Sequence, residues 1–179
     1  MSVLIGYATA RGSTRGIAER IATGLESRGA VELRALGDVA SVRTYEALIV
    51  GSAIHNGQWL PEASDAIYRL GTESEGRPVW AFSVSSIGAT STILSPRVAA
   101  YLRRVTPEPR AVQNLRSITD VRDHRFFAGA IASGDWAGIG RIVFRLMGGH
   151  YGDARDWVDV DAWTERIREG LIDIPRDQG

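Results

Sequence analysis

The sequence contains no cysteine, and this absence excludes several kinds of chemistry. A chain without thiols has no disulfide framework, thiolate nucleophile, iron–sulfur cluster or cysteine-ligated zinc. Redox activity would therefore need an organic cofactor. The late carboxylates Asp153, Asp156, Asp159 and Asp161 match no calcium-loop spacing, so we predict a solvated stretch and helix cap there, and no metal.

The sequence also lacks an excess of charge and a long apolar run. Lys+Arg and Asp+Glu both number 21, the formal net charge is +0, and every cationic side chain among them is arginine. A neutral chain has no basic field to attract nucleic acid, so we expect no nucleic-acid partner. The apolar run over residues 3–7 is too short for a signal peptide or a membrane span, and we expect a cytoplasmic protein.

Strand-like and helix-like patterns alternate along the chain. The predicted strands are 3–7, 31–36, 47–51, 78–84 and 125–131. Helical spacing follows Ser13, Pro61 and Val98, and a closing helix carries Trp163, Ile167 and Leu171, with Asp159 or Asp161 as its expected N-cap. This alternation predicts an α/β domain over residues 1–174, with a parallel sheet covered on both faces and a tail at 175–179.

The loop between the first predicted strand and helix has the composition of an anion site. Thr9, Ser13 and Thr14 supply hydroxyls, Gly12 permits close backbone approach, and a helix N-terminus offers unpaired N–H groups. The spacing matches neither the phosphate loop of nucleotide hydrolases nor the three-glycine dinucleotide motif. The alternative is that these hydroxyls only cap the helix. Arg11 and Arg15 either pair with the anion or are solvated.

The pattern Thr-x-x-Gly-x-Thr after an opening strand is similar to the FMN-phosphate signature of flavodoxins. This resemblance implies a flavodoxin-like, doubly wound, five-stranded sheet of order 2-1-3-4-5 and FMN as cofactor. The phosphate would lie on Thr9, Ala10, Arg11, Gly12, Ser13 and Thr14. The isoalloxazine would lie between Ser52, Ala53, Ile54, His55, Asn56 and Gly57 in one loop and Ser83, Val84, Ser85, Ser86 and Gly88 in another.

Further segments resemble the menaquinone-dependent protoporphyrinogen oxidase group of flavodoxin-like proteins. They are 50–54, 81–84, 128–130 and 147–149, leading to Asp153, Arg155 and 161–163. The resemblance implies an FMN-dependent oxidoreductase that takes electrons from an organic donor, a porphyrinogen in that group, and passes them to a quinone-type acceptor.

Two aromatic side chains in the loop after the third strand have open roles. His55 is the candidate catalytic residue, because an imidazole beside a reduced flavin can donate a proton or a hydrogen bond. The alternative is a solvent-facing histidine. Trp59 either flanks the flavin ring or packs the start of the next helix.

Two other functions fit the same fold. One is an electron shuttle of the flavodoxin type, although the net charge of +0 differs from the acidic surface typical of such carriers. The other is a flavin-free binding module, because a fold does not determine a function.

Residues 136–151 predict a late helical insertion. Ile139, Ile142, Val143, Leu146 and Met147 recur at helical spacing, with Arg141 and Arg145 on the other side. This apolar stripe either packs on the protein itself or on a second copy in a homodimer, or it lies against a membrane or beside the flavin. In the membrane case residues 136–151 would be a peripheral contact at the inner face, giving access to a lipid-soluble quinone.

Overall fold

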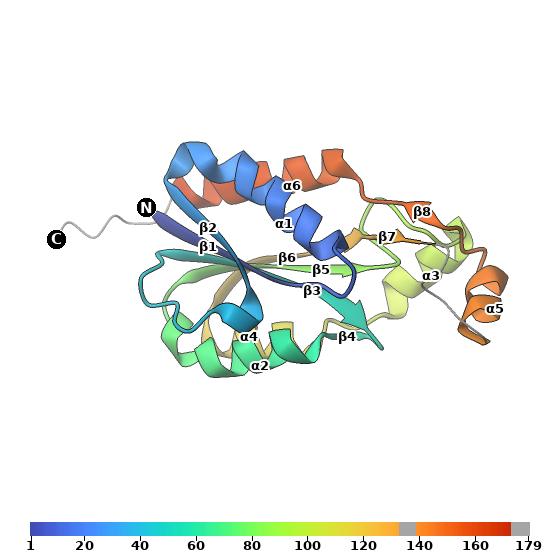
Figure 1. Ribbon diagram of the computed structural model, residues 1–179, viewed down its shortest axis with the longest axis horizontal. Coiled ribbons are helices and arrows are strands. Elements are labelled where there is room, and N and C mark those ends of the chain that lie inside the picture. The colour runs from blue at the N-terminus through green and yellow to red at the C-terminus, as the bar shows by residue number, and fades with distance from the viewer. Residues whose placement is uncertain (133–138, 173–179) are drawn as a thin grey trace.

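Strands and helices alternate along the described residues, 1–132 and 139–172, of this computed structural model (Figure 1). The strands are β1 (Ser2–Ala8), β2 (Ala30–Ala35), β3 (Ala47–His55), β4 (Gln58–Trp59), β5 (Pro78–Ser85), β6 (Asp120–Ala128), β7 (Ala130–Ile131) and β8 (Gly152–Asp153). The α-helices are α1 (Ser13–Leu25), α2 (Pro61–Leu70), α3 (Pro96–Val105), α4 (Arg110–Ile118), α5 (Ile139–Leu146) and α6 (Trp157–Ile172). Short 3-10 turns cover Glu26–Arg28, Leu36–Asp38 and Thr72–Ser74.

A parallel sheet forms the middle layer. Its strands lie in the order β2-β1-β3-β5-β6, and the short β4 pairs with β3 in antiparallel orientation. Helices α1 and α6 cover one face of the sheet, and α2 and α4 cover the other (Figure 1). The predicted five-stranded order with helices on both faces is confirmed.

Apolar side chains at helical spacing attach α1 and α6 to the sheet. Ile17, Ile21 and Leu25 of α1 and Trp163, Ile167 and Leu171 of α6 are buried in one core cluster. The indole of Trp163 packs edge-on against Phe82 and Phe127, with ring centroids 6.1 Å and 5.6 Å apart. Aromatic contacts of this kind stabilise a core beyond the area they bury.

The start of α6 differs from the prediction. The helix begins at Trp157, so Asp159 and Asp161 lie inside it and neither is the N-cap. The carboxylate of Asp156 accepts a hydrogen bond from the backbone N–H of Asp159 at 3.2 Å, which is the capping contact. The side chain of Asp159 instead pairs with Arg125 of β6, and Asp161 pairs with Arg20 of α1.

The region after β5 also differs from the prediction. Helix α4 has no predicted counterpart, and β6 begins at Asp120 rather than at Arg125. Strand β6 is one of the two edge strands of the sheet, and its first half carries the charged residues typical of a protected edge. Because of these charges, the first half of β6 contains no apolar run from which a strand could be predicted. Residues 130–131 are not part of this strand, because they form β7, which pairs with β8 in a separate small sheet.

Helix α5 buries a different side chain from those that the apolar stripe predicted. Phe144 is buried against Ile93 and Leu94, whereas Ile142 is 61% exposed and Leu146 81% exposed. The expectation that the stripe packs on the protein's own core is therefore wrong for these two positions and for the exposed Val143, whereas Met147 packs against this cluster. Residues 136–138 and 175–179 and the side chain of Ile139 lie outside the described residues. No helix among the described residues is long and apolar enough to cross a membrane.

Two ion pairs on α6 differ in burial and provide a matched test of what anchors this helix. The Asp159 side chain is 7% exposed, and the Asp161 side chain is 49% exposed. We expect Asp159→Asn to lower the free energy of unfolding by about 3 kcal/mol, because it leaves a largely buried guanidinium without its counter-charge. Asp161→Asn should lower the free energy of unfolding by much less, since solvent screens an exposed ion pair. Equal losses in urea unfolding would show that the buried pair does not anchor α6.

Candidate functional site

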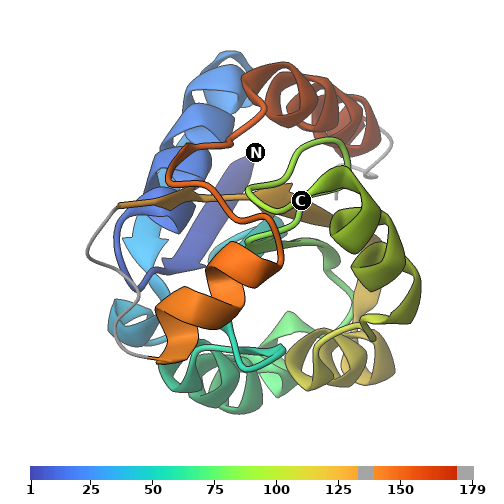
Figure 2. The same cartoon turned by 90° about the vertical axis from the view of Figure 1, so that its right-hand side faces the viewer.

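Two loops and three strand ends meet around a cavity at the carboxyl edge of the sheet. Figure 2 looks at this edge, with α5 at the lower left and α3 at the right. The cavity, here called the strand-end cavity, has a volume of about 330 Å³. Its lining contains the predicted residues Thr9, Ala10, Arg11, Ser13, Thr14, Ala53, Ile54, His55, Val84, Ser85 and Ser86. It also contains Gly129, Ala130 and Ile131, which the sequence interpretation did not assign to the site.

The first loop is shaped by Gly12. This residue has a φ of 89°, a conformation that glycine adopts without strain, and it precedes the first turn of α1. Its N–H donates to Thr9 Oγ1 at 2.9 Å, and its carbonyl accepts from the N–H of Gly16 at 2.9 Å. A Cβ at position 12 would meet no atom within 4 Å among the described residues. The loop therefore leaves open space in front of the helix N-terminus.

The hydroxyl of Thr14 is an unusual feature of this loop. Thr14 is fully buried, lines the strand-end cavity, and its Oγ1 has no hydrogen-bond partner among the described residues. Buried polar groups are nearly always paired, so an unpaired hydroxyl at a helix N-terminus indicates a place for an anion. The neighbouring Ser13 differs, because its hydroxyl donates to Ala130 O at 3.2 Å and accepts from Ala130 N at 3.0 Å. Ser13 thus joins the first loop to β7.

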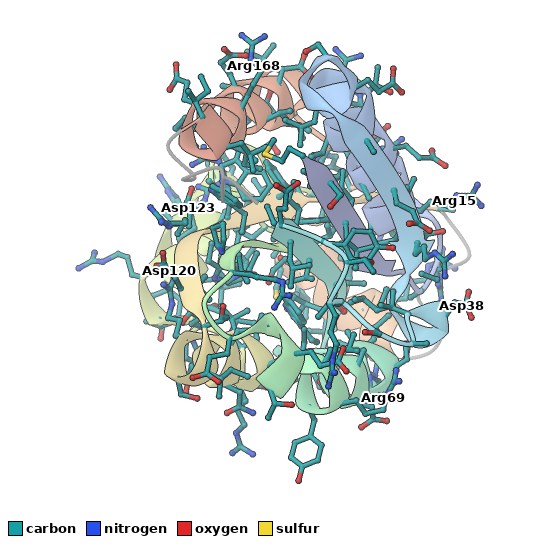
Figure 3. The ribbon with its side chains drawn as sticks, turned by 90° about the vertical axis from the view of Figure 1, so that its left-hand side faces the viewer. Arg15, Asp38, Arg69, Asp120, Asp123 and Arg168 are labelled. Carbon is teal, nitrogen blue, oxygen red and sulfur yellow. The ribbon has the colours of Figure 1, made fainter. Side chains whose placement is uncertain are left out.

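The two arginines of the first loop have different positions. Arg15 forms an ion pair with Glu19 at 2.8 Å and points outward from α1, as Figure 3 shows. Arg11 is exposed and lines the strand-end cavity. Only Arg11 is therefore placed to approach an anion in the cavity.

The loop after β3 is a hairpin. Strand β3 continues through His55, and residues 58–59 return beside it as β4. Asn56 and Gly57 form the turn with φ values of 50° and 76°, the backbone that an Asn-Gly pair favours between two strands. This Asn-Gly pair was a signal of the hairpin that the strand assignment overlooked. The hairpin holds His55 exposed at the strand-end cavity.

Several predicted ring contacts lie beneath the cavity rather than in its lining. Ser52 and Ser83 are fully buried; the Ser52 hydroxyl accepts from Leu60 N at 3.0 Å, and the Ser83 hydroxyl accepts from Trp59 Nε1 at 2.8 Å. Trp59 therefore packs inside the protein. Gly88 packs directly against backbone, since a Cβ there would lie 2.3 Å from Ala128 N.

His124 extends this buried hydrogen-bond network. Its Nε2 lies 2.9 Å from Ser83 Oγ, and its Nδ1 lies 2.9 Å from Glu108 Oε1. The Glu108 carboxylate can only accept, so Nδ1 carries the hydrogen of the neutral imidazole and Nε2 accepts from the Ser83 hydroxyl. Arg116 also donates to this carboxylate, from Nε to Oε2 and from Nη2 to Oε1, each at 3.1 Å. Ser83 has no exposed surface to meet a substrate, so this Ser-His-Glu arrangement positions β4 rather than attacking a substrate.

A family model described as a flavodoxin domain matches residues 4–147. The chain belongs to the flavodoxin-domain family. This match supports FMN as the cofactor, and the buried Thr14 hydroxyl and the open first loop fit its phosphate. No group of three or more His, Asp or Glu side chains among the described residues could hold a metal ion.

Solved structures share the architecture of this flavodoxin domain. The oxidised flavodoxin 1 of Bacillus cereus is 11% identical, with a TM-score of 0.57 and coverage of 94% of this chain and 98% of that one. A Fusobacterium nucleatum flavodoxin bound to flavin mononucleotide is 14% identical, with a TM-score of 0.56 and coverage of 94% and 98%. The rubredoxin oxygen:oxidoreductase of Desulfovibrio gigas is 15% identical (TM-score 0.55), covering 96% of this chain and 36% of that one. Identities this low show the fold alone. No curated protein matches this sequence.

The histidine in this flavodoxin domain's buried network has a perturbed pKa. Burial lowers the pKa of His124, against the opposing effect of Glu108; Arg116 lowers it further and Asp123 raises it. Burial alone would raise the pKa of Glu108, but Arg116 and His124 outweigh it and the pKa is lowered. The pair is therefore a neutral imidazole that donates to a carboxylate, not an ion pair.

This pKa shift predicts a pH-dependent stability. For a histidine whose folded pKa lies below its unfolded value of about 6.5, the contribution to the free energy of unfolding is fully present above that pH. The contribution is lost as the pH falls toward the folded pKa, because the unfolded state takes up a proton first. We expect the free energy of unfolding of the wild type to fall as the pH drops below 6.5. The variant His124→Phe should show a shallower slope, by up to about 1.4 kcal/mol per pH unit. Glu108 titrates at lower pH and does not enter this window.

Urea unfolding between pH 5 and pH 8 measures the slope, and the exposed His150→Gln serves as the control. Identical slopes in wild type and His124→Phe would contradict the assignment of a neutral, buried imidazole.

Proposed function

We propose that this protein is an FMN-dependent oxidoreductase that passes electrons between an organic donor and a quinone-type acceptor. The observation that carries the FMN assignment is the buried Thr14 hydroxyl, which has no partner among the described residues and lies at the start of α1. The family match supports the same cofactor independently. When bound, FMN supplies a ring that can take up and release electrons, and the protein supplies its position and surroundings.

In this proposal the first loop binds the phosphate. The Thr14 hydroxyl would donate a hydrogen bond to the phosphate, and the N–H groups of the first turn of α1 would face it. A helix N-terminus stabilises an anion by roughly 0.3–2 kcal/mol through its dipole. The Ser13 hydroxyl would also bind the phosphate if its hydrogen bonds to Ala130 break. Otherwise these bonds keep the first loop in place beside β7. Arg11 adds positive charge at the rim.

The isoalloxazine ring of FMN would lie in the strand-end cavity between the ends of β3 and β5. Residues 53–55 and 84–86 would contact it, with backbone and apolar side chains excluding water from its faces. His55 projects from an exposed hairpin at this cavity, so its imidazole can hold a proton where reduction of the ring requires one. Protein side chains thus orient the cofactor and handle protons.

The Thr14 hydroxyl provides a selective test of the cofactor site. Thr14→Val keeps the shape of the side chain and removes a hydroxyl that bonds to nothing described in the protein, so we expect unchanged folding stability. FMN affinity should fall by roughly 10- to 100-fold, the range for a hydrogen bond to a charged group. Riboflavin, which lacks the phosphate, should bind both proteins equally.

Thr164→Val is the matched control, because Thr164 is also buried but its hydroxyl donates to Val160 O at 2.8 Å. This variant should lose some stability and keep FMN affinity. Fluorescence titration of both flavins measures the result. An FMN affinity in Thr14→Val equal to that of the wild type would show that the phosphate binds elsewhere. A wild-type protein that binds neither flavin would be a flavin-free module.

The surface of α5 supports a lipid-soluble acceptor in this proposal. Ile142 and Leu146 form an exposed apolar edge one turn apart, beside the exposed Arg141 and Arg145. Apolar side chains flanked by arginines suit the surface of a membrane with anionic lipids. Helix α5 lies at the end of the molecule that carries the strand-end cavity (Figure 2). A quinone leaving the bilayer there would have a short path to the flavin.

We expect the intact protein to bind phosphatidylglycerol vesicles, and Ile142→Glu with Leu146→Glu to weaken this binding at least tenfold, because two charges replace buried apolar contact. Oxidation of the reduced protein by a vesicle-embedded quinone should slow, while oxidation by a water-soluble quinone should not. The control is Tyr68→Glu with Val158→Glu, two other exposed apolar positions. Vesicle sedimentation and stopped-flow absorbance measure both effects.

Three outcomes would revise this proposal. Unchanged vesicle binding and quinone rates in the α5 variant would leave a soluble reductase or an electron shuttle. A wild-type dimer that the α5 variant dissociates, seen by analytical ultracentrifugation, would assign the apolar edge to a second copy. The resemblance to the protoporphyrinogen oxidase group makes a porphyrinogen the first donor to assay, and its failure to reduce the protein would exclude that donor.

A further inference from the structure

The first turn of α1 is contacted by a late part of the chain that lies outside the five-stranded sheet. The small sheet of β7 and β8 lies beside the start of this helix (Figure 1). The Ser13 hydroxyl bonds to the backbone of Ala130 in β7, and Arg155, which follows β8, packs against Gly16. Residues distant in sequence therefore hold the turn that would face the phosphate of FMN.

Gly16 admits the Arg155 side chain because it has no side chain of its own. A Cβ at residue 16 would lie 2.6 Å from Arg155 Nη1, which is closer than non-bonded atoms approach. Gly16 lies inside α1, where glycine is less favourable than alanine. The close approach of the guanidinium is a physical reason for a glycine at this position.

Asp153 and Trp157 fix the Arg155 side chain. Arg155 Nε donates to Asp153 Oδ1 at 2.8 Å and Nη2 donates to Oδ2 at 2.6 Å, so the ion pair is bidentate. The guanidinium carbon lies 4.6 Å from the centroid of the Trp157 ring, at the start of α6. Nη1 takes no part in the bidentate pair, and it is the atom that faces Gly16. Asp153, Arg155 and Trp157 are here called the latch.

The first turn of α1 lacks the usual supports of a helix start. Gly12, at the N-cap position, has no side chain to accept a hydrogen bond, and the first turn contains no acidic residue. Capping side chains and acidic residues normally stabilise a helix N-terminus. An anion site needs these N–H groups unoccupied, so a side-chain cap would compete with the anion. Contacts from outside the helix have to hold the turn instead.

We propose that Arg155 is a positioning residue that gives the first loop its preference for FMN over flavins without a phosphate. This inference rests on the proposed function, because it concerns the same phosphate site. The latch holds the first turn of α1 in the position where its N–H groups would meet the phosphate. Hydrogen bonds weaken steeply when the donor moves out of line, so a displaced turn would lose affinity for the phosphate. Contacts to the flavin ring would come from residues 53–55 and 84–86 and would not change.

Removing Arg155 and displacing it should have the same effect. Arg155→Ala removes the guanidinium, and Gly16→Ala displaces it, because the new methyl group would clash with Nη1. We expect each variant to bind FMN roughly tenfold more weakly and to bind riboflavin as the wild type does. The double variant should bind FMN no more weakly than Arg155→Ala, because both substitutions act on one contact. Alanine favours a helix, so Gly16→Ala tests the latch without weakening α1 itself.

Two further variants serve as controls. Arg20→Ala removes the ion pair between Arg20 Nε of α1 and Asp161 Oδ1 of α6, which lie 2.7 Å apart further along the helix. This variant should leave both flavin affinities unchanged. Arg155→Lys keeps the charge but cannot form the planar bidentate pair, so it should behave like Arg155→Ala. Full FMN affinity in Arg155→Lys would show that only the charge matters and would overturn the positioning role.

Amide hydrogen exchange in the flavin-free protein gives a readout that does not depend on the cofactor. The N–H of Gly16 donates to Gly12 O at 2.9 Å in the first turn of α1. Arg155→Ala should raise the exchange rate of this amide and leave the amides of the last turn of α1 unchanged, because only the first turn is released.

Fluorescence titration with FMN and riboflavin measures the affinities. An unchanged ratio of the two affinities in Arg155→Ala and Gly16→Ala would overturn the proposal, while Thr14→Val would still test the phosphate site. Equal losses for both flavins, or a loss in Arg20→Ala as large as that in Arg155→Ala, would show a general structural role and would also overturn it. A wild type that binds riboflavin as tightly as FMN would contradict both this inference and the phosphate site.

Discussion

The parallel pairing of β1, β3 and β5 is the constraint on which the rest of the molecule depends. These strands pair in a continuous register, with Ile5 opposite Ile49 and Ile49 opposite Trp80. Both faces of the strands are buried, so each must return to the same end of the sheet through a helix on one face or the other. The carboxyl ends of all three strands therefore open at one edge, and the loops that follow them meet around the strand-end cavity.

Polar side chains at this edge perform two different tasks. Ser83 bonds to Trp59 and to His124, and the Ser52 hydroxyl accepts from Leu60 N, so these inward-facing groups hold the β3–β4 hairpin in a defined place. A half-satisfied network would be costly in a low-dielectric interior, and here every member has a partner. Thr14 breaks this rule at the N-terminus of α1, and this exception is what distinguishes a binding loop from an ordinary helix cap.

The strand-end cavity and α5 lie at one end of the protein, since α5 lies beyond the strand ends (Figure 2). In the proposed function this arrangement would place the cofactor close to a lipid surface. The opposite end carries charged side chains such as Asp120 and Arg168 (Figure 3) and lacks a proposed role in binding.

The sequence by itself determined the elements whose patterns are local. Apolar runs identified β1, β3 and β5, helical spacing identified α1, α2 and α6, and Thr9 to Thr14 identified the first loop, because each signal lies within a few neighbouring residues. Tertiary structure alone decided how distant residues combine. The network joins Trp59, Ser83, Glu108 and His124 from four elements or loops, and no spacing in the chain encodes their meeting. The burial of Phe144 in place of Ile142 and Leu146 likewise depends on how whole elements pack, since a helical stripe indicates which residues share a face and not which face the rest of the protein covers.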